Sequence, residues 1–170
     1  MKKTVLFLSI TFLCTTKSFS QENQINLKKF GVGISHAFNF MEVYNFEYPM
    51  DLNKIVFPIN INNRIRVEPE ISGAYNSFFD EFWVSVGSAV YFQKQHEKIN
   101  ILYGVNSGVS MSDWSFTLNA APTVGLEYFL SSQFSFGAEI QLKAGFSLDS
   151  DDSGINLALM APITARFYLK

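Results

Sequence analysis

The stretch from Trp114 to Leu130 reads WSFTLNAAPTVGLEYFL, and every second residue in it is apolar. Side chains of a β-strand alternate between its two faces, so a period of two predicts a strand with one apolar face. The same alternation runs from Phe134 to Leu148 and from Ile155 to Leu169. Most strands have only about 5–6 residues. Runs of this length, apolar on one side, are typical of a barrel wall that crosses a membrane.

Alternating runs cover most of the remaining chain as well. Asn62-Asn63 is typical of a tight turn, and Pro69 predicts a bulge or a missing hydrogen bond within its strand. The pattern predicts an all-β fold, an eight-stranded antiparallel up-and-down transmembrane barrel with a polar, closed interior. We expect its strands at about 29–40, 53–61, 64–75, 81–93, 98–111, 114–130, 133–148 and 155–169.

The N-terminus has the features of a secretory signal peptide. Two lysines precede a short apolar stretch, Val5 to Leu13, and Ser18-Phe19-Ser20 offers small residues for cleavage. We expect cleavage after residue 20, a loose lead-in over 21–28 and the barrel over 29–170. Cleavage would change the formal charge from −2 to −5 and remove Cys14, the one cysteine of the sequence. Disulfides and thiolate chemistry are then excluded, and a mildly acidic chain gives no support for nucleic-acid binding.

The composition of the two strand faces indicates which face points outward. In a soluble lipocalin-like barrel the apolar face would line an internal pocket. Here the polar face is rich in Gly, Ser, Ala and Asn, which suit a narrow interior, and aromatic residues gather toward both ends of the strands, as in the girdles of membrane barrels. We therefore expect the apolar face to contact lipid. The short turns at 62–63, 93–97 and 131–132 predict that both termini are periplasmic.

The segment Arg64-Ile65-Arg66-Val67-Glu68-Pro69-Glu70-Ile71 resembles a recurring third-strand motif of small outer-membrane barrels. Over residues of about 29–170 the chain resembles the superfamily of OmpX-like, OmpA-like and PorT-like barrels. The resemblance implies a location in the outer membrane of a Gram-negative envelope. Such barrels commonly end on an aromatic residue used in assembly, whereas this chain ends Phe167-Tyr168-Leu169-Lys170.

Charged side chains on the polar face predict an internal salt-bridge network, because an unpaired charge in a dry barrel would be very costly. The alternative is a selectivity ring in a small pore. Eight strands leave an interior just wide enough for side chains, so we expect no conduction. The expected network comprises Arg64, Arg66, Glu68, Glu70, Glu127, Glu139, Lys143 and Arg166, and Lys54 shares their face.

Candidate catalytic and metal-binding residues are few. Small-barrel enzymes that modify lipid A use a histidine with serine or carboxylate partners, but His36 is expected on the lipid face and His96 in a solvated turn. Asp149, Asp151 and Asp152 could bind Ca²⁺, although they lack the spacing of an EF-hand, and a solvated loop is favoured. We therefore assign no catalytic residue, cofactor or metal.

The sequence thus favours a non-enzymatic barrel with a role in envelope structure, surface interaction or as an accessory to a secretion apparatus. We expect a monomer in contact with outer-membrane lipid and lipopolysaccharide. Tyr44, Phe46 and Tyr48, in the loop expected at 41–51, are the candidate contact for a protein partner. A lipid A-modifying enzyme and a small pore remain the alternatives.

Overall fold

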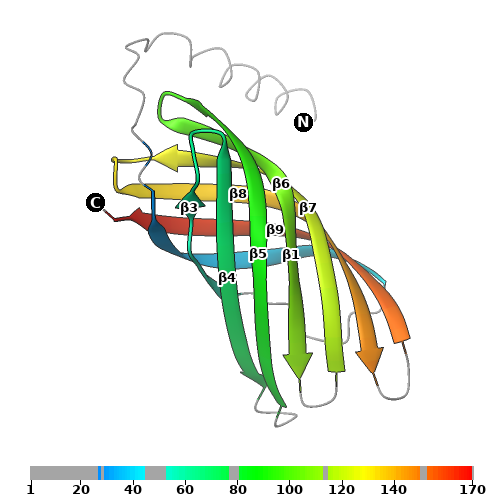
Figure 1. Ribbon diagram of the computed structural model, residues 1–170. Coiled ribbons are helices and arrows are strands. Elements are labelled where there is room, and N and C mark those ends of the chain that lie inside the picture. The colour runs from blue at the N-terminus through cyan, green and yellow to red at the C-terminus, as the bar shows by residue number, and fades with distance from the viewer. Residues whose placement is uncertain are drawn as a thin grey trace, which may run out of the picture.

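The computed structural model describes residues 27, 29–44, 53–76, 81–112, 115–149 and 153–169. No helix within this part of the chain is long and apolar enough to cross a membrane. The described residues form one antiparallel sheet (Figure 1). Its strands are β1 (Gly31–Tyr44), β2 (Asn53–Val56), β3 (Ile59–Asn60), β4 (Ile65–Asn76), β5 (Glu81–His96), β6 (Ile99–Ser112), β7 (Ser115–Phe129), β8 (Phe134–Asp149) and β9 (Ser153–Tyr168).

The sheet closes on itself. Its order is β2-β1-β9-β8-β7-β6-β5-β4-β3, and β2 pairs with β4 as well as with β1. β2 and β3 pair with β4 in one continuous register, so together they act as a single strand of the wall. The structure therefore confirms the expected eight-stranded antiparallel barrel, although the strand expected at 53–61 is divided in two.

Two prolines explain this division. Pro58 lies between β2 and β3, directly opposite the β4 segment that contains Pro69. The Phe57 N–H donates to the Pro69 carbonyl at 2.8 Å, but Pro69 has no N–H to return the bond. The register between β4 and β5 continues unchanged through Pro69 and Ser88. Of the two outcomes expected at Pro69, the structure shows the missing bond and no bulge.

The register also fixes the stagger of the barrel. A path along paired residues leaves β9 at Asn156, crosses every other strand through Gly145, Asn119, Gly108, Gly87, Glu70, Val56 and Gly33, and returns to β9 at Arg166. The return point is 10 residues further along the strand. With a rise of about 3.3 Å per residue and about 4.8 Å between strands, this stagger gives a tilt of roughly 40°. The tilt is visible where β4–β7 cross in front of β8, β9 and β1 (Figure 1).

The two ends of the barrel differ in what the structure describes. We call the end where β1 begins and β9 finishes the terminal end, and the opposite end the loop end. The terminal end carries the short connections at 61–64, 97–98 and 130–133. The connections of the loop end, residues 45–52, 77–80, 113–114 and 150–152, lie outside the described residues.

Two expected boundaries were wrong. The turn expected at 93–97 is shorter, because the polar side chains of Gln93 and Gln95 are held by hydrogen bonds and β5 continues to His96. At the other end, β1 continues to Tyr44 rather than ending near residue 40. Register shifts between Asn39 and Met41, and between Glu42 and Tyr44, keep this extension paired with β9.

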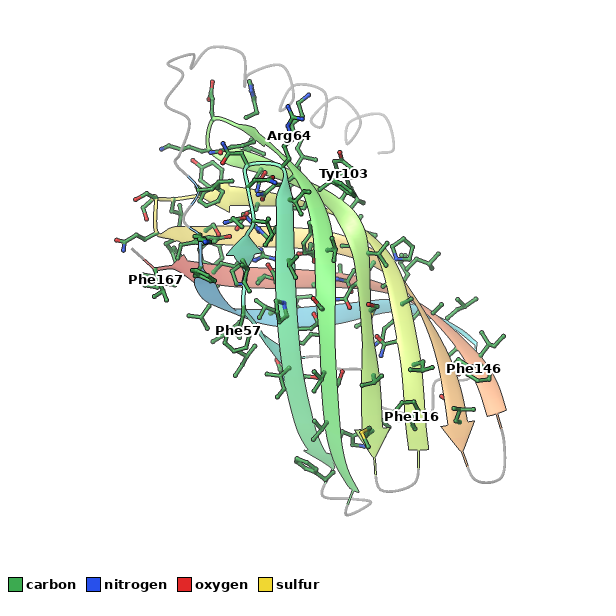
Figure 2. The ribbon with its side chains drawn as sticks, viewed as in Figure 1. Phe57, Arg64, Tyr103, Phe116, Phe146 and Phe167 are labelled. Carbon is green, nitrogen blue, oxygen red and sulfur yellow. The ribbon has the colours of Figure 1, made fainter. Side chains whose placement is uncertain are left out.

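Inward and outward residues alternate along every strand, with the apolar residues outside. Val124 is 53% exposed, whereas its neighbour Thr123, which faces the lumen, is 5% exposed. Large apolar side chains cover the outer wall in Figure 2, with Phe57, Phe167 and Tyr103 toward the terminal end and Phe116 and Phe146 toward the loop end. A continuous apolar surface of this size marks contact with a membrane rather than with water. The structure therefore confirms the expectation that the apolar face of the wall points outward.

Candidate functional site: an ion-paired plug in the lumen

The charged residues of the lumen gather toward the terminal end. Arg66 and Glu68 extend inward from β4, and Glu127, Glu139 and Arg166 extend inward from β7, β8 and β9. Both arginines are completely buried, with 0% of their surface exposed. We call these five residues, together with Tyr91 and Tyr168, the interior plug. Its members come from five strands, so it ties opposite walls of the barrel together.

Glu127 is the centre of one half of the plug. Arg66 Nη2 donates to Glu127 Oε2 at 2.7 Å, and Arg66 Nε donates to Asn60 Oδ1 at 3.0 Å. The other oxygen of Glu127, Oε1, accepts bonds from the hydroxyls of Ser135 at 2.6 Å and Tyr168 at 2.7 Å. Both oxygens of this buried carboxylate are therefore bonded, as a buried charge requires.

Arg166 is the centre of the other half. Its Nε and Nη2 donate to the two oxygens of Glu68 at 3.0 and 2.9 Å, a bidentate pair that fixes both planar groups. Arg166 Nη2 also donates to Glu139 Oε1 at 3.0 Å, and the Tyr91 hydroxyl donates to Glu139 Oε2 at 2.9 Å. Longer contacts of 3.9 Å, from Arg66 to Glu68 and from Arg166 to Glu127, join the two halves. The plug is thus one connected network of charges.

A second ion pair lies beside the plug. Lys54 Nζ donates to Glu70 Oε1 at 2.6 Å, and Asn106 Nδ2 donates to Glu70 Oε2 at 2.9 Å. Lys143 lies on β8, four residues beyond Glu139 toward the loop end, and is also buried in the lumen. Among the residues whose side chains the structure describes, the lumen therefore holds four bases and four acids: Lys54, Arg66, Lys143 and Arg166 with Glu68, Glu70, Glu127 and Glu139.

Glycines on the inner face provide the space for these side chains. A Cβ on Gly137 would collide with Arg166 Nη1, and a Cβ on Gly125 would lie 2.6 Å from the Cγ of Glu139. At Gly33 a Cβ would lie 3.0 Å from the Cγ of Arg166. Glycine at these positions lets two large side chains lie flat against the wall, so the backbone is adapted to the plug.

A small cavity lies between the plug and the middle of the lumen. This cavity of about 10 Å³ is lined by plug residues, by the Lys54–Glu70 pair and by small residues such as Ser35 and Thr164. This is about the volume that one water molecule needs. Chemically, the arrangement is suited to sealing the barrel at its terminal half.

The structure places seven of the eight residues expected in the network inside the lumen. The eighth, Arg64, was assigned wrongly. It lies in the connection 61–64 and is exposed, because Asn62 Oδ1 accepts the backbone N–H of Arg64 at 2.7 Å and of Ile65 at 2.9 Å, forming a turn before β4 begins. The alternation of inward and outward residues had been continued one residue too far, to a position before β4 begins.

Other candidate residues lie elsewhere. His36 is outward-facing and exposed, with its Nδ1 2.8 Å from Asn53 Oδ1, and His96 ends β5 at the terminal end. Tyr44 ends β1, whereas Phe46 and Tyr48 fall outside the described residues, as do Asp151 and Asp152. Within the described ranges, no group of three His, Cys, Asp or Glu residues is placed to hold a metal ion.

Tyr168 was the plug member that sequence reasoning missed. It lies two residues after Arg166 on β9 and therefore on the same inward face, and this spacing was the available signal. Its ring also lies near Arg66, which binds the same carboxylate of Glu127, with the guanidinium carbon of Arg66 5.8 Å from the ring centroid. The segment that had been considered for assembly therefore also contributes to the lumen.

Comparison with known proteins gives similarity of fold rather than of sequence. No protein-family profile and no curated protein matches the chain. Among solved structures, Neisserial surface protein A (NspA) is similar with a TM-score of 0.56 and 10% identity, covering 82% of this chain and 96% of that protein. The attachment invasion locus protein Ail of Yersinia pestis has a TM-score of 0.46 and 15% identity, covering 83% of this chain and 99% of Ail.

The TM-score of NspA is above 0.5, and at 10% sequence identity the similarity shows the fold alone. The closed barrel and its apolar outer wall agree with it. The resemblance expected from the sequence is thereby confirmed at the level of architecture: the chain has the fold of the small eight-stranded outer-membrane β-barrels.

Proposed function

We propose that the protein is a non-enzymatic outer-membrane barrel whose lumen is sealed and whose loop end serves as a contact surface. The observation that carries this proposal is the interior plug, in which Arg66 and Arg166 are completely buried and bonded to acids from other strands. A barrel closed in this way offers the cell its lipid-facing wall and its two ends. The proposed roles are envelope structure, surface interaction or support of a secretion apparatus.

The plug argues against the pore alternative. Ions crossing the barrel would have to pass side chains that span the lumen, beside a cavity of about 10 Å³. Opening a path would separate pairs such as Arg166 and Glu68, which are costly to leave unpaired in a dry site. Purified protein in planar lipid bilayers should therefore show no steady conductance. Reproducible open states of one defined conductance would overturn the sealed barrel and favour the pore.

The lengths of the connections support an orientation. Those at the terminal end include a two-residue turn, Glu97-Lys98, and outer-membrane barrels have their short turns on the periplasmic side. We therefore propose that both termini are periplasmic and that the loop end faces the outside. Cleavage of the expected signal peptide, residues 1–20, belongs to the same proposal.

The absence of cysteine after residue 14 allows a direct test of this orientation. Ser132→Cys would place a thiol in an exposed turn of the terminal end, and Ser150→Cys would place one between β8 and β9 at the loop end. A membrane-impermeant maleimide added to intact cells should label Ser150→Cys and not Ser132→Cys, and both should react after lysis. The opposite labelling pattern would show that the orientation is reversed.

The contact surface is proposed at Tyr44, Phe46 and Tyr48, because aromatic residues are common anchors of protein interfaces. The proposed partners are lipopolysaccharide and one protein partner, bound by a monomeric barrel. Crosslinked complexes should be recovered from intact cells with the wild-type chain and lost when the three aromatics are replaced by serine. A control variant, Tyr103→Ser on the wall near the terminal end, should retain them. Equal recovery from all three chains would refute the contact surface.

A further inference from the structure

Exposed cations gather at one side of the terminal end. Lys29 precedes β1, Arg64 lies in the connection between β3 and β4, Lys94 is near the end of β5, and Lys98 lies in the turn that follows. All four side chains are exposed. We call these four residues the basic rim.

Backbone hydrogen bonds place the segments of the rim side by side. The Asn60 N–H donates to the Lys29 carbonyl at 2.9 Å, which joins the start of β1 to β3. The Gln93 N–H donates to the Arg64 carbonyl at 2.8 Å, which joins the next connection to β5. The bonds from Asn62 Oδ1 hold the turn that carries Arg64. The cations are therefore presented by neighbouring, ordered segments rather than scattered around the barrel.

The rim lies at the height expected for lipid headgroups. Lys94 follows Phe92 on the outer face of β5, and the Phe92 ring stacks on Tyr103 with ring centroids 5.7 Å apart. Lys29 Nζ lies 5.6 Å from the ring centroid of Phe30, another outward aromatic residue. Aromatic girdles mark the border between hydrocarbon and headgroups, and lysines next to them extend toward the polar side.

The charge of the rim is not balanced in the way that the charge of the lumen is. The four bases that the structure describes in the lumen are matched by four described acids. At the terminal end, Glu97 is the one acid that the described residues provide beside the four cations. A net positive surface at headgroup height attracts anionic lipids, and Lys and Arg donate hydrogen bonds readily to phosphate oxygens.

We propose that the basic rim binds the phosphates of anionic phospholipids, of the phosphatidylglycerol class, in the leaflet at the terminal end of the barrel. This inference rests on the proposed location and orientation of the barrel, whereas its test in reconstituted bilayers does not depend on the orientation. The bound lipids would form part of the boundary layer on the side of the barrel where β3, β4 and β5 end.

Spin-labelled lipids in reconstituted bilayers test the proposal. The fraction of motionally restricted lipid reports whether the barrel is embedded, and the preference for labelled phosphatidylglycerol over phosphatidylcholine reports binding by the rim. The wild-type barrel should prefer phosphatidylglycerol several-fold. Lys94→Gln should lower this preference in part, by up to about twofold. Replacing all four rim residues by glutamine should bring it close to one.

The controls separate the rim from folding and from general electrostatics. Glu97→Gln removes the nearby acid and should keep or raise the preference for phosphatidylglycerol. All variants should retain the wild-type fraction of restricted lipid, and loss of that fraction in the wild type would instead refute the membrane location. An unchanged preference in the four-residue variant would overturn the proposal. It would also be overturned if millimolar glycerol phosphate abolished the preference while chloride of equal ionic strength did not, since the rim would then bind free phosphate.

Discussion

The two halves of the lumen are built from different side chains although one set of strands forms both. Toward the terminal end, Arg66, Arg166 and Glu127 are fully buried and bonded across the barrel. Toward the loop end, the inner face that the structure describes carries mainly small residues, and their hydrogen bonds join adjacent strands, such as the bond between the Thr117 and Ser147 hydroxyls at 3.0 Å. The first half joins distant strands by charge, whereas the second joins neighbours by neutral bonds. The comparison indicates that the residues of the terminal half seal the lumen. They also contribute much of what determines which strands meet when the barrel closes.

The largest difference is expected from two truncations on the same strand. Arg166→Ala leaves Glu68 and Glu139 buried without their partner and should lower the free energy of unfolding by about 3–5 kcal/mol. Asn156→Ala, in the loop-end half of β9, removes a neutral hydrogen bond to Ser147 and should cost about 1 kcal/mol. Urea unfolding in phospholipid vesicles measures both. Equal costs would remove the distinction between the halves.

On the outer wall, the cost of a substitution should not differ between the terminal and loop-end halves as it does in the lumen. Val124 and Leu142 both face outward near the middle of their strands, on β7 and β8. Arginine at either position should lower stability by roughly 2–4 kcal/mol if it meets the bilayer midplane. Thr117→Arg, on the inner face, is the control and should not follow the same dependence on depth. If Val124→Arg folds into vesicles with unchanged stability, the outward face is not the lipid face.

Two glycines of β8 offer a matched test of packing. A Cβ at Gly137 would collide with Arg166, so Gly137→Ala should destabilise the barrel by about 1–3 kcal/mol. At Gly145, in the loop-end half, the nearest atom to a Cβ is the Thr117 Cγ2 at 3.3 Å. Gly145→Ala should be neutral or stabilise by up to about 1 kcal/mol, because alanine restricts the unfolded chain. Guanidinium unfolding measures both changes in stability. If the two substitutions change the free energy of unfolding equally, the plug does not fill the terminal half of the lumen.

The smallest effect concerns the pairing inside the plug. Arg66 lies 2.7 Å from Glu127 but 3.9 Å from Glu68. A double-mutant cycle with alanine should give a coupling energy of roughly 0.5–3 kcal/mol for Arg66 and Glu127. The cycle for Arg66 and Glu68 should give less. A larger value for the second pair would mean that the halves of the plug are paired differently.

Alternation along the chain was enough to predict the strands, the two faces and seven of the eight residues expected inside. It was not enough to predict which charges meet. Arg166 and Glu68 are 98 residues apart in sequence, and they pair because the stagger brings β9 and β4 to the same height across the lumen. The stagger depends on hydrogen-bond register around all the strands, which no local pattern encodes.

Local hydrogen bonds account for two of the assignments that the sequence did not predict. Gln93 and Gln95 are polar and therefore favoured a turn, but Gln93 Nε2 donates to Asn60 Oδ1 at 3.1 Å inside the lumen. The assignment of Arg64 to the lumen was wrong for the opposite reason, since Asn62 forms a turn where the alternating pattern predicted a strand. Both errors lie at the terminal end, where polar side chains are used for structure rather than for solvation.

The plug also has a consequence for the time course of assembly. Two of its ion pairs join residues 61 and 98 positions apart, and one of its arginines belongs to β9. Neither pair can form within one hairpin, so its stabilisation is gained only when distant strands are brought together across the lumen. Chains with such high contact order pay the entropy of loop closure before they gain contact energy, and they fold slowly. The barrel is therefore expected to close in a late, all-or-none step in which β9 completes the wall and the lumen together.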